Sequence, residues 1–263
     1  MQKLGMYTGI SYPRTLEERL ELIKAAGFDV VCLNFEEDMR WSETDWENQV
    51  KLAQKYRLPV QAVHLTGTKM TGIWTDGEVA EYVTDRLIQE LEGMSQVGVP
   101  IGVAHITWGF DKPPAPSESA LRRFERIAAA AEKYNVKLAL ENSVFAEHVH
   151  YILSHIPSDH VGFCYDSGHE NAFTPTEDYL SVYPERLLTM HLHDNIGSYD
   201  NHFAPFDPRG TIDWEKKALQ LKRTKAGSEY IIIEVGPQDV TMEELITQSY
   251  NAAYKLAELS DAT

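Results

Sequence analysis

The sequence repeats one arrangement along its length, a short apolar segment followed by a longer segment with helical spacing of its apolar residues. The apolar segments lie at residues 3–11, 29–35, 59–65, 102–108, 137–143, 161–167, 187–193 and 230–235. The helical segments lie at residues 15–27, 44–57, 78–98, 117–135, 148–156, 177–185, 212–223 and 241–259. Short apolar runs are typical of buried strands, and the longer pattern is typical of amphipathic helices. Strands that alternate with helices predict the α/β class, with a parallel sheet covered by helices.

The number of repeats indicates which α/β fold the chain adopts. Eight strand-helix units in 263 residues match the size of a (β/α)8 barrel, the TIM barrel. We therefore predict one TIM barrel domain over residues 1–263, with the functional groups at the carboxyl ends of its strands. A doubly wound open sheet is the alternative, but no G-x-G-x-x-G turn follows the first apolar segment.

Residues at the segment boundaries support these helices. Gly27 and Gly98 stand where C-terminal caps are expected, and Thr15, Thr44 and Ser117 stand where N-caps are expected. The runs at 74–78, 111–119 and 198–213 are rich in Gly, Pro, Asp and Asn, so we expect loops there.

Charge and cysteine content restrict the partners and the compartment. The formal net charge of −16 argues against a protein that neutralises a nucleic-acid backbone, although a local basic patch can coexist with an acidic whole. Cys32 and Cys164 lie in apolar runs, which predicts buried free thiols and a cytoplasmic location. No signal peptide or membrane span is expected, and both a monomer and a homo-oligomer stay open.

Polar residues end six of the apolar segments. They are His64, His105, Glu141, Asp166, His191 and Glu234. Any one of them alone is better explained as a hydrogen-bonded core residue or a rim ion pair. The set is different, because strand ends converge in a barrel and several buried carboxylates need a cation or protons to neutralise them. The pattern therefore favours a metal site over a purely structural polar network.

The ligand types indicate which cations suit the site. Glu141, Asp166, Glu234 and His191 form a set of three carboxylates and one imidazole, which suits Mn, Mg, Co, Fe or Zn. Further candidates for a site with more than one metal are His64, His105, His169, Asp200 and His202. In the stretch "MHLHDN", His191 is expected to face the metal, His193 to contact a ligand or the substrate, and Asp194 to hold the turn.

Five motifs in this order, "LALENS", "GFCYDSGHEN", "MHLHDN", "SYDNHF" and "IIIEV", resemble the xylose-isomerase-like TIM barrel superfamily. That superfamily joins sugar isomerases, ketose epimerases, related dehydratases and the endonuclease IV class (AP endonuclease family 2). The resemblance covers nearly the whole chain and implies that Glu141, Asp166, His191 and Glu234 hold one divalent cation. It also implies a substrate contact for His169, for which a role as a partner of Asp166 is equally open.

The sequence matches two branches of this superfamily to different degrees. In ketose 3-epimerases a second glutamate six residues after the first is usual, which Glu147 matches, but the arginine expected after the ligand histidine is missing from "HLHDNIGS". Endonuclease IV enzymes hold three zinc ions, and the residue types of all their ligands are present here. The motif context resembles the sugar phosphate isomerase/epimerase-like group more closely, and no segment after His64 resembles the DNA-penetrating loop of the repair enzymes.

The resemblance thus implies a divalent-metal-dependent isomerase or epimerase of a sugar or sugar phosphate, with Mn, Mg, Co or Zn as the cofactor. The cation would stabilise an ene-diolate, while Glu141 and Glu234 would exchange a carbon-bound proton as base and acid. The residues expected to bind substrate are His64, His105, His169, His193, Trp108 and Arg209. The aromatic residues considered as walls for a sugar, with ordinary packing as the alternative, are Trp74, Trp108, Phe35, Phe203 and Phe206.

Two other functions stay open. One is a phosphodiesterase that cleaves abasic DNA with three zinc ions, and the other is a sugar-binding barrel without turnover. Arg209 is a candidate contact for a phosphate, although a solvated loop arginine is equally plausible. Because no Gly-rich phosphate-binding loop is present, both free and phosphorylated sugars stay open as substrates.

Overall fold

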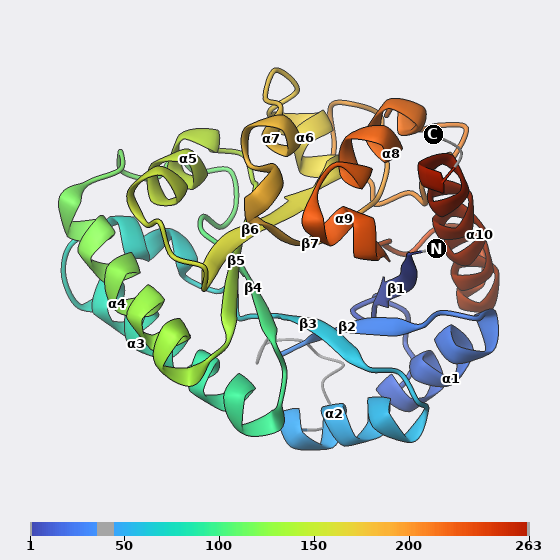
Figure 1. Cartoon of the computed structure of the whole chain (residues 1–263), viewed down its shortest axis with the longest axis horizontal. Coiled ribbons are helices and arrows are strands. Elements are labelled where there is room, and N and C mark those ends of the chain that lie inside the picture. Colours follow the sequence, from blue (N-terminus) through green and yellow to red (C-terminus); the bar gives the residue numbers. More distant parts are fainter. Residues whose placement is uncertain (1, 36–44, 262–263) are drawn as a thin grey trace.

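Eight parallel strands form a barrel that the helices surround (Figure 1). The computed structural model describes residues 2–35 and 45–261. The strands are β1 (Lys3–Tyr7), β2 (Val30–Asn34), β3 (Val60–His64), β4 (Ile101–His105), β5 (Lys137–Glu141), β6 (Val161–Asp166), β7 (Leu187–His191) and β8 (Tyr230–Ile233). They pair in the order β7-β6-β5-β4-β3-β2-β1-β8. This arrangement confirms the predicted TIM barrel.

The barrel closes between β7 and β8 through one residue beyond the end of β7. The Leu192 N–H donates to the Ile232 carbonyl at 3.0 Å, and the Leu192 carbonyl accepts from the Glu234 N–H at 3.1 Å. These two bonds align the carboxyl end of β7 with the residue that follows β8. His191 and Glu234, both predicted ligands, are thereby brought next to each other.

The helices lie outside the strands. The longer ones are α1 (Leu16–Ala26), α2 (Trp46–Lys55), α3 (Glu78–Val97), α4 (Glu118–Tyr134), α5 (Ala146–His155), α8 (Trp214–Lys222) and α10 (Met242–Asp261). The shorter ones are η1 (Met70–Trp74), α6 (Ser167–Phe173), α7 (Tyr179–Val182), η2 (Pro184–Arg186) and α9 (Lys225–Glu229). The first and last long helices, α1 and α10, pack side by side and complete the ring (Figure 1).

The predicted caps can be compared with the observed helix ends. Thr15 forms a capping box with Glu18, Ser117 accepts from the Ala120 N–H, and Gly27 and Gly98 end α1 and α3 in the left-handed conformation. These predictions are confirmed. The N-cap of α2 is Asp45. The predicted cap Thr44 lies outside the described residues.

Several predicted boundaries were wrong. The helix expected over 177–185 is divided into α7 and η2, because Pro184 has no N–H with which to continue an α-helix. The short helices η1, α6 and α9 were missed, since five to seven residues do not establish a helical period. The loop predicted at 74–78 comprises only residues 75–77. The loop predicted at 111–119 ends earlier than expected, because α4 begins at Glu118.

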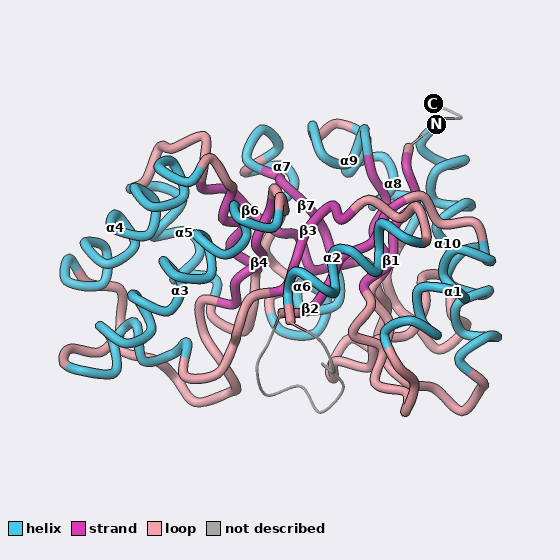
Figure 2. Tube along the Cα trace, turned by 90° about the horizontal axis from the view of Figure 1, so that it is seen from below, coloured by secondary structure: helices cyan, strands magenta, loops and turns pink. Residues whose placement is uncertain are grey.

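The broad loops after the strands lie along one side of the molecule, where the carboxyl ends of the strands point (Figure 2). The segment 198–213 is the predicted long loop, with one isolated antiparallel bridge between Asp194 and Phe203. Cys32 and Cys164 are buried free thiols, as predicted. Within residues 2–35 and 45–261, no helix has both the length and the apolar character that crossing a membrane requires.

Candidate metal centre

The six polar residues predicted at strand ends all lie at the carboxyl ends of their strands. His64, His105, Glu141, Asp166 and His191 are the last residues of β3 to β7, and Glu234 follows β8 directly. Because parallel strands end at one side of the barrel, the six side chains lie together there. The ligand atoms of Glu141, Asp166, His191 and Glu234 all lie within 4.8 Å of one another.

The three innermost members of this group are packed around one point. His191 is fully buried, and its Nδ1 lies 3.0 Å from Glu141 Oε1 and 2.7 Å from Glu234 Oε2. Within the described part of the chain, Glu234 Oε2 and Glu141 Oε2 are buried yet receive no hydrogen bond of suitable direction. A bound cation satisfies buried carboxylate oxygens of this kind, and both residues belong to the group whose ligand atoms lie within 4.8 Å of one another. The residues present fit a divalent metal.

A second group of possible ligands adjoins Glu141. His105 Nε2 lies 3.0 Å and His64 Nε2 lies 3.4 Å from Glu141 Oε2. His64 Nδ1 is 3.0 Å from the Leu65 carbonyl, so this nitrogen carries a proton and Nε2 is the nitrogen that faces Glu141. The structure thus brings the additional candidates His64 and His105 to the same carboxylate.

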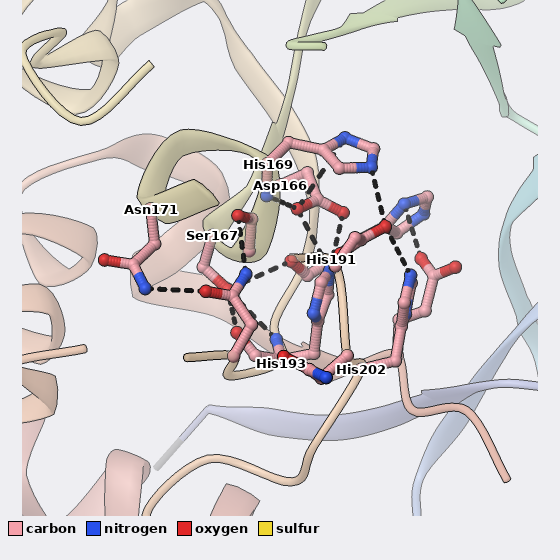
Figure 3. A network of polar contacts seen from close by, with 12 residues as sticks. Asp166, Ser167, His169, Asn171, His191, His193 and His202 are labelled. Carbon is pink, nitrogen blue, oxygen red and sulfur yellow. Dashed lines mark hydrogen bonds and ion pairs between the residues drawn. The ribbon is translucent and has the colours of Figure 1, made fainter. Parts of the chain in front are cut away.

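A third group surrounds Asp200, which belongs to the long loop (Figure 3). His202 Nε2 lies 3.0 Å and His169 Nε2 lies 3.4 Å from Asp200 Oδ2. His169 Nδ1 donates to the Asn142 carbonyl at 2.8 Å, which turns Nε2 toward Asp200. The His193 and His202 rings stack at 3.8 Å. All five additional candidates for a multinuclear site therefore adjoin the first group.

Asp166 is held in place by its neighbours. As the N-cap of α6 it accepts the His169 N–H at 2.6 Å, and His193 Nε2 lies 3.0 Å from the same oxygen (Figure 3). Asn142 clamps the Asp166 backbone, accepting its N–H at 2.7 Å and donating to its carbonyl at 2.8 Å. His193 is fully buried. Its imidazole therefore orients Asp166.

The short turn after Asp166 also depends on small residues. The Ser167 hydroxyl donates to the His193 carbonyl at 2.7 Å and accepts the His193 N–H at 3.0 Å. A Cβ at Gly168 would lie 1.9 Å from His193 Cε1, so only glycine leaves room for that ring. Sequence inspection assigned no role to Asn142, Ser167 or Gly168, although all three stand in the quoted motifs "LALENS" and "GFCYDSGHEN".

Two further residues near the centre were missed because their strand ends carry no typical metal ligand. Tyr7 ends β1 and Asn34 ends β2, and Asn34 Nδ2 donates to the Tyr7 hydroxyl at 2.7 Å. The Tyr7 ring lies 5.9 Å from the His191 ring and 6.1 Å from the His64 ring, centre to centre. Tyr7 therefore forms part of the wall of the site.

The electrostatics of the site follow from unlike charges buried together. Burial alone would raise the pKa of Glu141, but the charges of His105 and His191 outweigh it and hold that pKa well below its usual range. The same balance, with His191 as the main partner, lowers the pKa of Glu234 to about 2. Burial disfavours the charged form of His169, but Asp166 and Asp200 raise the pKa of this imidazole well above its ordinary value. Protons on the imidazoles thus neutralise the carboxylates where no cation does.

A thiol adjoins the ligands, which the sequence interpretation did not expect. The Cys164 Sγ, Glu141 and His191 ligand atoms lie within 4.8 Å of one another. Burial raises the pKa of the Cys164 thiol, so it stays neutral at ordinary pH.

Asp194, predicted to hold the turn, does so. Its Oδ1 accepts the N–H groups of Asn195, Thr211 and Ile212 at 2.8, 3.0 and 3.2 Å. Its Oδ2 accepts the Trp214 indole N–H at 2.7 Å. Asp194 therefore anchors the end of the loop that carries Asp200 and His202.

The aromatic residues proposed as sugar walls have different surroundings. Trp74 is buried, with its indole N–H bonded to the Ile106 carbonyl, and Phe35 stacks on Trp46 at 4.5 Å. Phe203 is buried, and Phe206 lies 6.0 Å from the Trp214 ring. Trp108 is 46% exposed, and its ring lies 5.4 Å from that of His105.

Two other charged candidates lie outside the ligand groups. Arg209 is bound by Asp207, with its Nε 2.9 Å from Oδ1 and its Nη2 2.8 Å from Oδ2, and its guanidinium lies 3.9 Å from the centre of the Phe203 ring. Glu147, on α5, is exposed and lies 3.9 Å from His148 Nδ1. The glutamate expected of ketose 3-epimerases is therefore not a ligand in this arrangement.

Known proteins with this fold include several enzymes of sugar chemistry. Solved structures similar to this chain include a D-tagatose 3-epimerase-like protein (TM-score 0.77, 18% identity, 99% of each chain). A D-psicose 3-epimerase solved in the presence of D-fructose has a TM-score of 0.75 and 15% identity over 98% of this chain and 99% of that one. The IOLI protein, solved with a bound zinc atom, has a TM-score of 0.78 and 19% identity over 98% of both chains.

Sequence comparisons identify the family. An uncharacterized protein, y4fM, of Sinorhizobium fredii (strain NBRC 101917 / NGR234) is 37% identical over 105 residues, which are 37% of this chain and 33% of that protein. The match thus spans about a third of that relative's length. The profile of the family described as "Xylose isomerase-like TIM barrel" matches residues 20–252. The chain therefore belongs to the xylose isomerase-like TIM barrel family.

Proposed function

We propose that this protein is a divalent-metal-dependent isomerase or epimerase of sugars. The observation that carries the proposal is the convergence of two glutamates, the buried Glu141 and the partly buried Glu234, on one nitrogen of His191. The similar folds of a D-tagatose 3-epimerase-like protein, a D-psicose 3-epimerase and a zinc-binding protein support it. Mn, Mg, Co and Zn all suit a site of three carboxylates and one imidazole.

The chain's own residues divide the work of proton transfer. A cation held by Glu141, Asp166, His191 and Glu234 would supply the positive charge that polarises a substrate carbonyl and stabilises an ene-diolate. Glu141 and Glu234 are both held ionised, so each starts the reaction as a proton acceptor. The one nearer the acidic C–H takes that proton, and returning it to the neighbouring carbon completes an isomerisation. In an epimerisation the other glutamate takes the proton of a substrate hydroxyl group and delivers it to the opposite face of the same carbon, and the first glutamate returns its proton to that oxygen.

The histidines around the centre have separate roles in this proposal. His105 and His169 line a pocket beside the metal centre, and we assign them to hydrogen bonds with substrate hydroxyl groups. His64 is buried behind Glu141 and orients that carboxylate. His193 holds Asp166, so we assign it a positioning role in place of a substrate contact.

Substitution of the two glutamates tests the proposal. We expect Glu141→Gln and Glu234→Gln each to slow exchange of the substrate's carbon-bound proton with D2O by about 100-fold or more, because general base catalysis typically contributes that much. Proton NMR follows the exchange on D-fructose, D-tagatose and D-psicose with Mn or Co supplied. Glu147→Gln is the matched control, since Glu147 is exposed on α5, and it should keep full activity. Full activity of Glu141→Gln, or no exchange by the wild type on any free or phosphorylated ketose, contradicts the proposal.

The second and third ligand groups favour one other function. Together with Glu141, the groups around His105 and Asp200 provide room for more than one metal, as a phosphodiesterase that cleaves abasic DNA requires. The net charge of −16 opposes binding to DNA. Elemental analysis of protein purified without chelator separates the two functions. We expect about one ion per chain, whereas about three zinc ions with incision of an abasic oligonucleotide would establish the phosphodiesterase.

A further inference from the structure

A pocket of about 300 Å³ opens directly beside the metal centre. Its lining includes His105, His169 and Asp200, which belong to the second and third ligand groups. Its lining also includes Trp108, Phe110 and Phe173, which we call the aromatic wall. A molecule bound at the metal centre and extending by one more group would therefore enter this pocket.

The aromatic wall is exposed to a degree that packing does not explain. Phe110 is 72% exposed and Trp108 is 46% exposed. The Phe110 and Phe173 ring centres lie 5.6 Å apart, and Phe173 lies 5.8 Å from His169. The Trp108 ring lies 5.4 Å from His105, so both parts of the wall adjoin the ligand groups. Exposed, contiguous aromatic surface is costly in water and marks a place where a ligand binds.

Trp108 is fixed in position before any ligand binds. The Thr71 hydroxyl accepts the Trp108 N–H at 2.7 Å and donates to the Trp108 carbonyl at 3.0 Å. The indole lies against Gly67, where a Cβ would come within 2.3 Å of the ring. A large side chain held this way loses little conformational entropy on binding, so it is suited to be an anchor.

The charge of the pocket decides which group it accepts. Among the described residues that line it, none is a lysine or an arginine, and Asp200 contributes a carboxylate. Arg209, the candidate for a phosphate, is bound to Asp207 instead. Lys112 follows Phe110 by two residues but does not line the pocket. A phosphate would meet the Asp200 carboxylate here and neither a lysine nor an arginine, and the His169 imidazole is already paired with Asp200.

We propose that this pocket is a subsite for an uncharged ring of the substrate, which stacks on the aromatic wall while the carbonyl end lies at the metal centre. The substrate class is then a neutral, glycosylated ketose or a comparable sugar with an apolar substituent. This inference rests on the proposed function. It adds that neutral sugars, and not sugar phosphates, are the preferred substrates.

Three ketoses with the same reacting end test the subsite. They are D-fructose, 6-O-glucosyl-D-fructose (isomaltulose) and D-fructose 6-phosphate, and the readout is kcat/KM for proton exchange with D2O. We expect isomaltulose to exceed D-fructose by about tenfold, as one aromatic contact allows, and the phosphate to fall below D-fructose. Preference for D-fructose 6-phosphate, or no preference for isomaltulose, would overturn the subsite while leaving the proposed function intact.

Variants of the wall locate the effect. Phe110→Ala, at a largely exposed position where folding is not at risk, should reduce the isomaltulose to D-fructose ratio to near one, and Trp108→Ala should do the same. Lys112→Ala is the control and should leave all ratios unchanged. A selective loss of D-fructose 6-phosphate turnover in Lys112→Ala would contradict the uncharged subsite.

A failure of the proposed function can be told apart from a failure of the subsite, because in the first case no ketose exchanges its carbon-bound proton with D2O. In that case, saturation-transfer NMR with phenyl β-D-glucoside tests the pocket without any reaction. We expect transfer to the phenyl protons in the wild type and its loss in Phe110→Ala. Equal transfer in both proteins, or none in the wild type, overturns the subsite.

Discussion

His191 shows how a single residue couples the fold to the chemistry. A fully buried imidazole beside two carboxylates is stable only if it is protonated or if a cation takes its lone pair. Burial disfavours the charged ring, yet the carboxylates of Glu234 and Glu141 beside it raise its pKa well above the ordinary value. The same nitrogen is therefore a proton site in the metal-free protein, and in the proposed metal-bound protein it would be a ligand.

Replacement of His191 is expected to reduce metal content without unfolding the barrel. His191→Ala removes the nitrogen nearest to both glutamates, so we expect bound metal, measured by elemental analysis, to fall by about tenfold or more at equal metal concentration. His148→Gln is the matched control. His148 lies on α5 and is equally buried, but its Nε2 bonds to the Pro114 carbonyl and not to a predicted ligand. Equal metal content in His191→Ala and wild type would show that the site lies elsewhere.

At the scale of elements, the long loop after β7 is the part of the site that packing supports least. The segment 198–213 contains no helix or strand, yet it carries Asp200 and His202. Its far end is tied down by Asp194, which satisfies two backbone N–H groups of the loop and the Trp214 side chain at the start of α8. One buried carboxylate thus takes the place of regular secondary structure.

Loss of this anchor is expected to be costly. Asp194→Ala leaves the buried Trp214 indole N–H and neighbouring backbone donors unsatisfied, so we expect the free energy of unfolding to fall by roughly 3 kcal/mol. Urea unfolding followed by circular dichroism measures it. Asp213→Ala, which removes only the exposed N-cap of α8, should cost about 1 kcal/mol. Similar losses in the two variants would deny Asp194 a special role.

At the scale of the whole molecule, the metal centre links stability to pH. The protein carries a net charge of −16, and its central site adds several carboxylates that repel one another when no cation is present. Burial lowers the pKa of His64 and His202, but Glu141 and Asp200 outweigh it and raise the pKa of each. Raised imidazole pKa values mean that the folded, metal-free protein binds protons more tightly than the unfolded chain.

The direction of the pH dependence should therefore reverse with metal. In the metal-free protein, the contribution of these histidines is fully present below their unfolded pKa of about 6.5 and is lost as pH rises through the raised values. Metal competes with those protons, so its stabilisation grows with pH, reaching about 4 kcal/mol when free metal exceeds Kd by about 1,000-fold. Urea unfolding of chelator-treated and Mn-loaded protein at about pH 6 and about pH 8 measures both trends. A metal-free protein whose stability rises over this range contradicts the account.

The sequence by itself determined the barrel and predicted most of the residues of the candidate metal centre. The period of the apolar residues is a local property of the sequence, so the alternation of segments predicted all eight strands. The positions of Glu141, Asp166 and His191 at strand ends followed from the same pattern. The sequence pattern did not predict the short helix α6, because its start depends on the Asp166 cap more than on a hydrophobic period.

Only the tertiary structure decided what each polar side chain contacts. Asp194 finds Trp214 20 residues further along the chain, and Asn142 clamps Asp166 24 residues away, distances over which no local pattern specifies a partner. The aromatic wall was decided in the same way, because Phe110 meets Phe173 from a distant part of the chain. The reason is physical: strands have a fixed period and direction, whereas loops take the path on which their buried polar groups find partners.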